Sequence, residues 1–221
     1  MTGPKIKERL MTNVYAYGII EQEDLELVVE AVAGASRVYT VDYKTLSAVV
    51  SPIDTKDPER TDKDVNRHNE VLRTVMEHGD GRTVVPMSFG MAFKNERTLK
   101  GVMRGARRAF RKALNDIEGT VELGVKLIAS DSADLNGEAI RDDVGDRLGP
   151  HYVSETDNDL FSERLLLNKS YLVERDGRDA FDDAIDKIEA EYEDVLTVQY
   201  TGPWAPYNFV DIHIGANKGG R

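Results

Sequence analysis

The residue types that most often catalyse reactions or bind metals are sparse in this chain of 221 residues. No two of its four histidines have a spacing, such as i and i+4, at which helical residues bind zinc. Cysteine is absent, which excludes disulfides and thiolate metal sites. Ser88 precedes Gly90 but lacks the first glycine of a nucleophile elbow. The sequence therefore predicts a protein that is not an enzyme and has no metal or cofactor.

His68 is the histidine with the clearest setting. It recurs at helical spacing with apolar residues, namely Val65, Leu72, Val75 and Met76. A histidine on an apolar helix face is usually buried and hydrogen bonded. We expect this role for His68 rather than that of a metal ligand.

A basic stripe is unusual in so acidic a chain. Eight basic residues lie from Lys94 to Lys112, and Glu96 is the only acid among them. On a helical wheel they lie opposite the apolar face. Two interpretations stay open, a docking surface for an acidic partner and a solvated face that is unpaired or paired internally with the acidic C-terminal half. The docking interpretation selects Arg104, Arg107, Arg108 and Arg111.

The run Thr201-Gly-Pro-Trp-Ala-Pro-Tyr-Asn-Phe-Val210, here called the aromatic segment, is stiff and rich in large side chains. Its prolines restrict φ and favour extended backbone at the residues before them. Such a segment can form an interface hot spot at low entropic cost. Alternatively, Trp204 fills the seam between two domains. The candidate binding residues are Pro203, Trp204, Pro206, Tyr207 and Phe209.

The net charge is -11, and the acidic residues are spread along the whole chain. Dispersed carboxylates repel one another in dilute solution, whereas the Debye length falls to about 3 Å at 1 M salt. We interpret this as the surface of a halophile's protein, with an ordinary acidic protein as the alternative. General nucleic-acid binding is disfavoured because it needs positive charge facing the phosphates.

Apolar runs in the chain are short, whereas a membrane span needs about 20 apolar residues. The first ten residues are polar and charged, without the apolar core of a signal peptide. We therefore expect a soluble cytoplasmic protein that does not cross a membrane.

The first half of the chain alternates strand and helix patterns. Apolar alternation predicts a strand over 13–20 and a hairpin over 37–51 that ends at Pro52. Asp62 is the expected cap of a helix that Gly79 and Gly81 end. A short strand over 82–87 and a long amphipathic helix over 95–117 follow.

The second half repeats this mixture after Gly119. We predict strands over 120–129, 170–174 and 196–200, and helices ending at Gly149 and covering 178–192. Residues 165–169 are interpreted as the end of a helix. These patterns predict an α+β fold with domains at 1–118 and 119–214, each close to a split βαβ or ferredoxin-like unit, and a disordered tail at 215–221.

Three stretches resemble the gas vesicle protein F/L family over nearly the whole chain. They are Tyr15-Ala-Tyr-Gly-Ile19, the run Val84-Val-Pro-Met-Ser-Phe-Gly-Met-Ala-Phe93, and the aromatic segment, which is the most specific. The resemblance implies two α+β domains, of which the C-terminal one is a modified ferredoxin-like fold.

The resemblance also implies a role in assembling the gas vesicle, a protein-walled gas compartment. The implied partners are the hydrophobic main shell protein, gas vesicle protein A, and other accessory proteins. Two rival classes stay open from the residues alone. A small-molecule-binding regulator would need a deep pocket with converging polar groups. An enzyme would need a cleft whose titratable groups have displaced pKa values.

Overall fold

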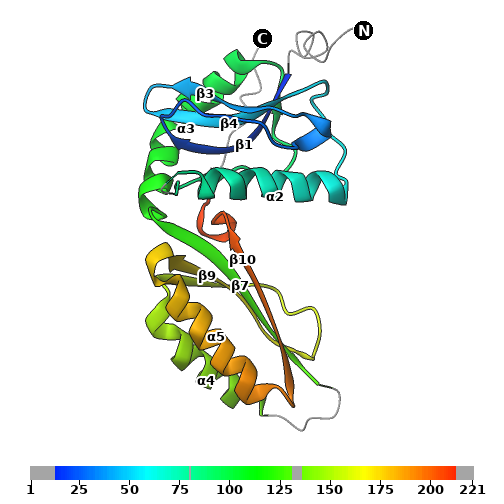
Figure 1. Cartoon of the computed structure of the whole chain (residues 1–221), viewed down its shortest axis with the longest axis vertical. Coiled ribbons are helices and arrows are strands. Elements are labelled where there is room, and N and C mark those ends of the chain that lie inside the picture. The colour runs from blue at the N-terminus through cyan, green and yellow to red at the C-terminus, as the bar shows by residue number, and fades with distance from the viewer. Residues whose placement is uncertain (1–12, 80, 131–135, 213–221) are drawn as a thin grey trace. The chain divides into compact units, whose positions relative to one another are not determined.

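The computed structural model describes residues 13–79, 81–130 and 136–212. The chain divides into two compact units (Figure 1), Met1–Glu118 with Val210–Arg221, and Gly119–Phe209. Each unit contains one sheet with helices beside it. The tail predicted to be disordered, 215–221, lies outside the described residues.

The first unit is built on a sheet with the strand order β2-β3-β4-β1-β5, in which β6 also pairs with β1. Two long helices, α2 and α3, accompany it. The elements in chain order are β1 (Asn13–Glu21), β2 (Glu26–Leu27), the short 3-10 turn η1 (Val32–Gly34), β3 (Val38–Tyr43), β4 (Leu46–Ile53), α2 (Asp62–Glu77), β5 (Val85–Pro86), β6 (Ala92–Phe93) and α3 (Glu96–Asp116).

Strand β1 is the centre of this unit. Its residues from Val14 to Ile20 are all buried, because α2 and α3 both pack against it and leave neither face to solvent. Gly18 is needed at its middle, since an added Cβ would lie 2.8 Å from the Val85 carbonyl oxygen. The first stretch of family resemblance is therefore the core strand of the first unit.

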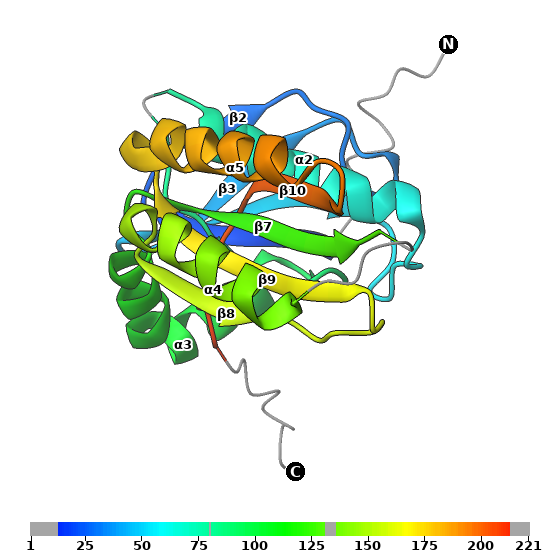
Figure 2. The same cartoon turned by 90° about the horizontal axis from the view of Figure 1, so that it is seen from below.

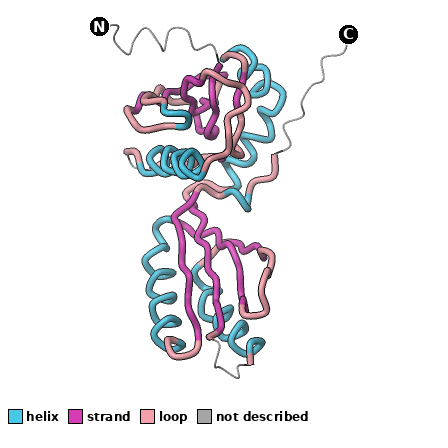
Figure 3. Tube along the Cα trace, turned by 90° about the vertical axis from the view of Figure 1, so that its right-hand side faces the viewer, coloured by secondary structure: helices cyan, strands magenta, loops and turns pink. Residues whose placement is uncertain are grey.

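The second unit has the element order β-α-β-β-α-β and an antiparallel sheet in the order β10-β7-β9-β8. Helices α4 and α5 pack against each other on one face of this sheet (Figures 2 and 3). The elements are β7 (Thr120–Ala129), α4 (Gly137–Leu148), the turn η2 (Gly149–His151), β8 (Ser154–Asp157), β9 (Leu165–Glu174), the turn η3 (Arg175–Gly177), α5 (Arg178–Tyr192), β10 (Leu196–Trp204) and the turn η4 (Tyr207–Phe209).

The amphipathic helices were predicted well. Helix α3 begins after Asn95, whose side chain accepts a hydrogen bond from the Thr98 amide, and α5 has the predicted bounds. One residue of the predicted apolar face of α3, Ala109, is exposed. Leu135, whose spacing with Ile140, Val144 and Leu148 helped to predict the helix ending at Gly149, lies outside the described residues.

Three local predictions were wrong, and one strand was missed. Residues 165–169 belong to strand β9, because Leu165 and Leu167 pair with β7 and are buried. Pro52 lies inside β4, at a position where β4 no longer pairs with β3 and its missing N–H is not needed. The cap of α2 is Thr61 rather than Asp62. Strand β8 had no predicted counterpart.

Candidate protein-binding surfaces

The aromatic segment extends strand β10 and then turns. Strand β10 continues to Trp204, and η4 follows at Tyr207–Phe209. The Trp204 side chain is 40% exposed, and its indole N–H donates to the Thr201 hydroxyl at 3.4 Å. Pro203, Tyr207 and Phe209 are half-buried, whereas Pro206 is buried. The segment thus presents Trp204 on a backbone that is packed beneath it.

A buried carboxylate holds this segment on its own sheet. Glu122 of β7 is only 5% exposed, and both of its oxygens accept hydrogen bonds from Asn208. The Asn208 amide N–H lies 2.9 Å from Oε2, and the side-chain Nδ2 lies 2.6 Å from Oε1. Asn208 Nδ2 also donates to Ser170 of β9 at 2.9 Å. Asn208 therefore ties the segment to two neighbouring strands.

Gly202 makes the turn before Trp204 possible. Its φ of 122° lies where side chains are rarely tolerated, and an added Cβ would lie 2.8 Å from the Glu122 carbonyl oxygen. Close contact between the segment and β7 thus depends on this glycine. Sequence reasoning selected the aromatic residues here but missed Glu122 and Asn208, which position them.

The predicted basic face of α3 is present in the structure. Arg104, Arg108 and Arg111 are exposed and Arg107 is half-buried. Within the described residues, none of these four arginines forms an ion pair, whereas Lys112 pairs with Asp116. Both interpretations of this stripe, a docking surface and a solvated or internally paired face, therefore stay predictions.

His68 lies in a buried aromatic cluster, as its helical spacing predicted. It is 2% exposed, and its Nδ1 lies 2.8 Å from the Tyr15 hydroxyl, which accepts from the Gly90 amide at 3.1 Å. Phe89 packs edge-on against both rings. The first two stretches of family resemblance therefore meet at His68.

Burial lowers the pKa of His68 to about 4, although a backbone hydrogen bond with Met87 opposes this shift. The imidazole is thus neutral at pH 7 and its Nδ1 accepts the Tyr15 proton. Burial also raises the pKa of Tyr15 well above its usual range. The buried groups of this cluster are neutral and hydrogen bonded, and the exposed Arg60 lies over its Phe89 ring, 5.5 Å from the ring centroid.

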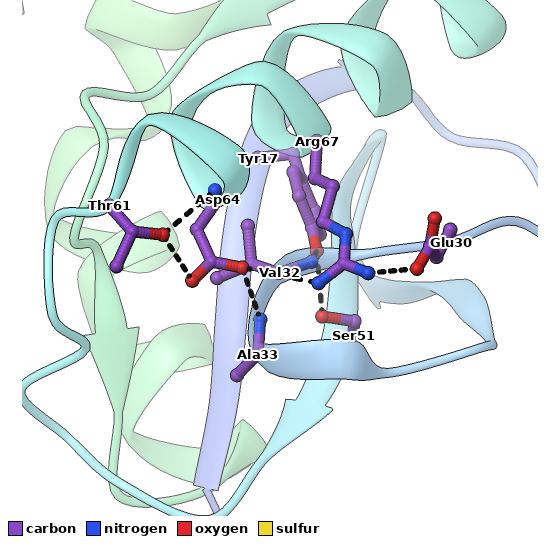
Figure 4. Close-up of polar contacts among 8 residues, drawn as sticks. All are labelled: Tyr17, Glu30, Val32, Ala33, Ser51, Thr61, Asp64 and Arg67. Atoms are coloured by element: carbon purple, nitrogen blue, oxygen red, sulfur yellow. Dashed lines mark hydrogen bonds and ion pairs between the residues drawn. The ribbon is translucent and has the colours of Figure 1, made fainter.

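A second set of polar contacts fixes the turn η1 against β1 and α2 (Figure 4). The Tyr17 hydroxyl accepts from the Val32 amide at 3.1 Å and lies 2.8 Å from the Ser51 hydroxyl. Asp64 accepts from the Ala33 amide at 2.9 Å. These bonds satisfy backbone groups in a connection that has little regular structure of its own.

Arg67 completes this set from the next turn of α2. It pairs with Glu30 and lies 3.6 Å from Asp64, which also accepts from the Thr61 hydroxyl at 3.0 Å. The contacts tie three separate parts of the first unit together. Their geometry is that of a structural brace.

Neither a metal site nor a membrane span was found in the described part of the chain. Among residues 13–79, 81–130 and 136–212, no group of three or more acidic or histidine side chains could hold a metal ion. No helix there has the length and apolar character that crossing a membrane requires. A groove of about 680 Å³ lies between α4 and β8, where Lys169 pairs with Glu155 and Asp157.

Each of the two units has one antiparallel sheet with two helices beside it, so the chain is of the α+β class. Comparison with known proteins identifies the family. The family model for gas vesicle synthesis protein GvpL/GvpF matches residues 13–141 and 132–211. The chain therefore belongs to the GvpL/GvpF family of gas vesicle proteins.

Similar curated proteins agree with this assignment. The chain is 72% identical over 206 residues to gas vesicle protein F of Haloferax mediterranei, covering 93% of this chain and 97% of that protein. It is 67% identical over 211 residues to gas vesicle protein F1 of Halobacterium salinarum, covering 95% and 99%. Both relatives come from halophilic archaea, the setting that the acidic composition predicted.

A solved structure shares the fold. The crystal structure of gas vesicle protein GvpF from Microcystis aeruginosa superposes with a TM-score of 0.80 at 18% identity, covering 91% of this chain and all of that chain. The mixed helix and strand fold with two sheets is thus the fold of that protein too.

Proposed function

We propose that this chain is an assembly protein of the gas vesicle that binds the main shell protein, gas vesicle protein A, through the aromatic segment. Its family membership supports a role in gas vesicle formation. The observation that carries the binding role is Trp204, a large side chain left 40% exposed on a segment that Asn208 fixes to two strands. Preorganised aromatic side chains bind with little further loss of entropy.

The apolar character of the shell subunit explains why an exposed aromatic surface would be needed. A shell subunit with an apolar, gas-facing side would aggregate before incorporation unless another protein covered it. Trp204 offers an apolar body with a polar edge, which suits transient contact with such a surface. We therefore assign the chain to the stage at which shell subunits are held and delivered to the growing wall.

The test is co-purification with the main shell protein at high salt. We expect Trp204→Ala to lose most of the bound shell protein while the chain stays folded by circular dichroism. Phe161→Ala is the matched control, because Phe161 is an aromatic residue of the same unit, is 75% exposed and lies outside the segment. Full binding by Trp204→Ala, or equal loss in both variants, would reject the role of the segment.

We further infer that the chain contacts other gas vesicle accessory proteins, acts in the cytoplasm beside the vesicle, and catalyses no reaction. The two units correspond in this proposal to two domains. The second is a ferredoxin-like domain, a description supported by its β-α-β-β-α-β order and its sheet order β10-β7-β9-β8. An activity that depends on side chains of the groove between α4 and β8 would contradict this proposal.

A further inference from the structure

Helix α3 and helix α5 carry opposite charges on their exposed faces. On α3, basic residues occupy one narrow stripe at positions 97, 100, 104, 107, 108 and 111, and all but the half-buried Arg107 are exposed. On α5 and its C-cap residue Glu193, the exposed acids Asp179, Asp183, Asp186, Glu189 and Glu193 occupy a similar stripe. Both stripes extend over fifteen residues, or roughly 21 Å from the first residue to the last. They match in length and in period, and they are opposite in sign.

Within its own unit, neither stripe is neutralised by ion pairs of the described residues. Among residues 13–79, 81–130 and 136–212, no basic residue of the α3 stripe and no acid of the α5 stripe forms an ion pair. Like charges at i and i+3 or i+4 destabilise a helix by a few tenths of a kcal/mol per pair. Each helix therefore carries a repulsion that a face of opposite charge would remove.

We propose that these two faces form a contact between copies of this chain, with α3 of one copy docked on α5 of another. The inference is independent of the proposed function, because it uses neither the aromatic segment nor the shell protein. Charge complementarity selects a second copy as the occupant, since the chain itself supplies both faces. One α3 and one α5 per chain permit either a closed pair or a longer assembly.

High salt requires this contact to be close. At about 1 M salt the Debye length is about 3 Å, so only directly touching charges still attract. The α3 surface permits close approach, because Gly101 and Gly105 are exposed and an added Cβ at either would meet no atom within 4 Å. Arginine suits such contacts because its guanidinium can bond a carboxylate in two places.

The experiment is a charge swap followed by sedimentation velocity of the full chain in about 2 M KCl. We expect the mass of the wild type to rise with concentration. Two double variants should each associate more weakly than the wild type, by roughly tenfold or more. They are Arg104→Glu, Arg108→Glu and Asp183→Arg, Asp186→Arg. An equimolar mixture of the two should associate again, because each supplies the charge that the other has lost.

A matched control changes the net charge by the same amount elsewhere. Lys56 and Lys63 are exposed and lie outside both stripes, so Lys56→Glu, Lys63→Glu should associate like the wild type. Circular dichroism establishes that every variant is folded. The inference is overturned if the wild type is monomeric at all concentrations, if folded swapped variants fail to associate when mixed, or if the control loses association equally.

Discussion

Each unit buries a polar cluster where a stretch of family resemblance meets its sheet, and the His68 and Glu122 clusters differ in charge. In the first unit, His68, Tyr15 and the Gly90 amide are neutral groups bonded to one another. In the second, the Glu122 carboxylate is bonded to Asn208. A neutral cluster can be repacked at modest cost, whereas a buried carboxylate requires its donors. The second cluster therefore fixes the orientation of the segment that supplies those donors.

The largest expected effect is at Asn208. Asn208→Ala removes the side-chain donor to Glu122 and to Ser170, and we expect a loss of about 3 kcal/mol of unfolding free energy, since a buried carboxylate is left underbonded. Chemical denaturation at constant salt measures it. Asn66→Ala, at an exposed position of α2, should change little. A loss equal to that of the control would remove the distinction between the clusters.

The second prediction concerns pH. Because burial lowers the pKa of folded His68 to about 4 from an unfolded value of 6.5, the unfolded chain binds more protons between these pH values. Stability contributed by neutral His68 is complete above pH 6.5 and falls as the pH drops toward 4. At pH 5 the loss is about 2 kcal/mol.

His68→Gln is the comparison for this pH dependence. It keeps a hydrogen-bonding side chain but does not titrate, so the difference between wild type and variant isolates His68 from the many surface carboxylates. Denaturation curves at pH 7 and pH 5 measure both proteins. Identical pH dependence in the two would show that His68 is not the neutral buried group described above.

Tyr17→Phe tests the neutral hydrogen bonds of the first unit. It removes the hydroxyl that bonds Ser51 and the Val32 amide, and we expect a loss of about 1.5 kcal/mol. Amide hydrogen exchange should show faster exchange at Val32, whose N–H loses its acceptor. Tyr43→Phe is the control, at a half-buried tyrosine of β3. Equal losses in both would mean that the brace around η1 contributes little.

Ser170→Ala should have the smallest effect. Ser170 bonds Asn208 and Asn158, but both oxygens of Glu122 keep their bonds when it is removed. We expect a loss of about 1 kcal/mol. Denaturation beside Ser154→Ala, an exposed serine of β8, measures the difference. A loss as large as that of Asn208→Ala would shift the central role from Glu122 to Ser170.

The sequence predicted the elements whose pattern depends only on one buried face. Helices α3 and α5 and strand β7 have strong periodicity, and their bounds were close or identical to the prediction. Strand β8 was missed because Ser154–Asp157 is a short, polar strand at the edge of its sheet, which carries no apolar alternation.

The sequence identified only some residues of the candidate surfaces. Residue type alone marked the exposed arginines of α3 and Trp204. Glu122 could not be found, because it alternates with Val121 and Leu123 as a solvent-facing residue would. Its burial arises only when Asn208, distant in sequence, folds over that face of β7. The one available signal was Asn208 itself, a polar residue inside the aromatic segment.

We propose that the Glu122–Asn208 contact holds the aromatic segment as a binding surface for the shell protein. The most direct measurement is the amount of main shell protein that co-purifies at high salt with folded Asn208→Ala, whose Trp204 is intact. We expect binding to fall roughly tenfold or more, as for Trp204→Ala. Wild-type binding by folded Asn208→Ala would contradict the claim, because the segment would then bind without being held in place.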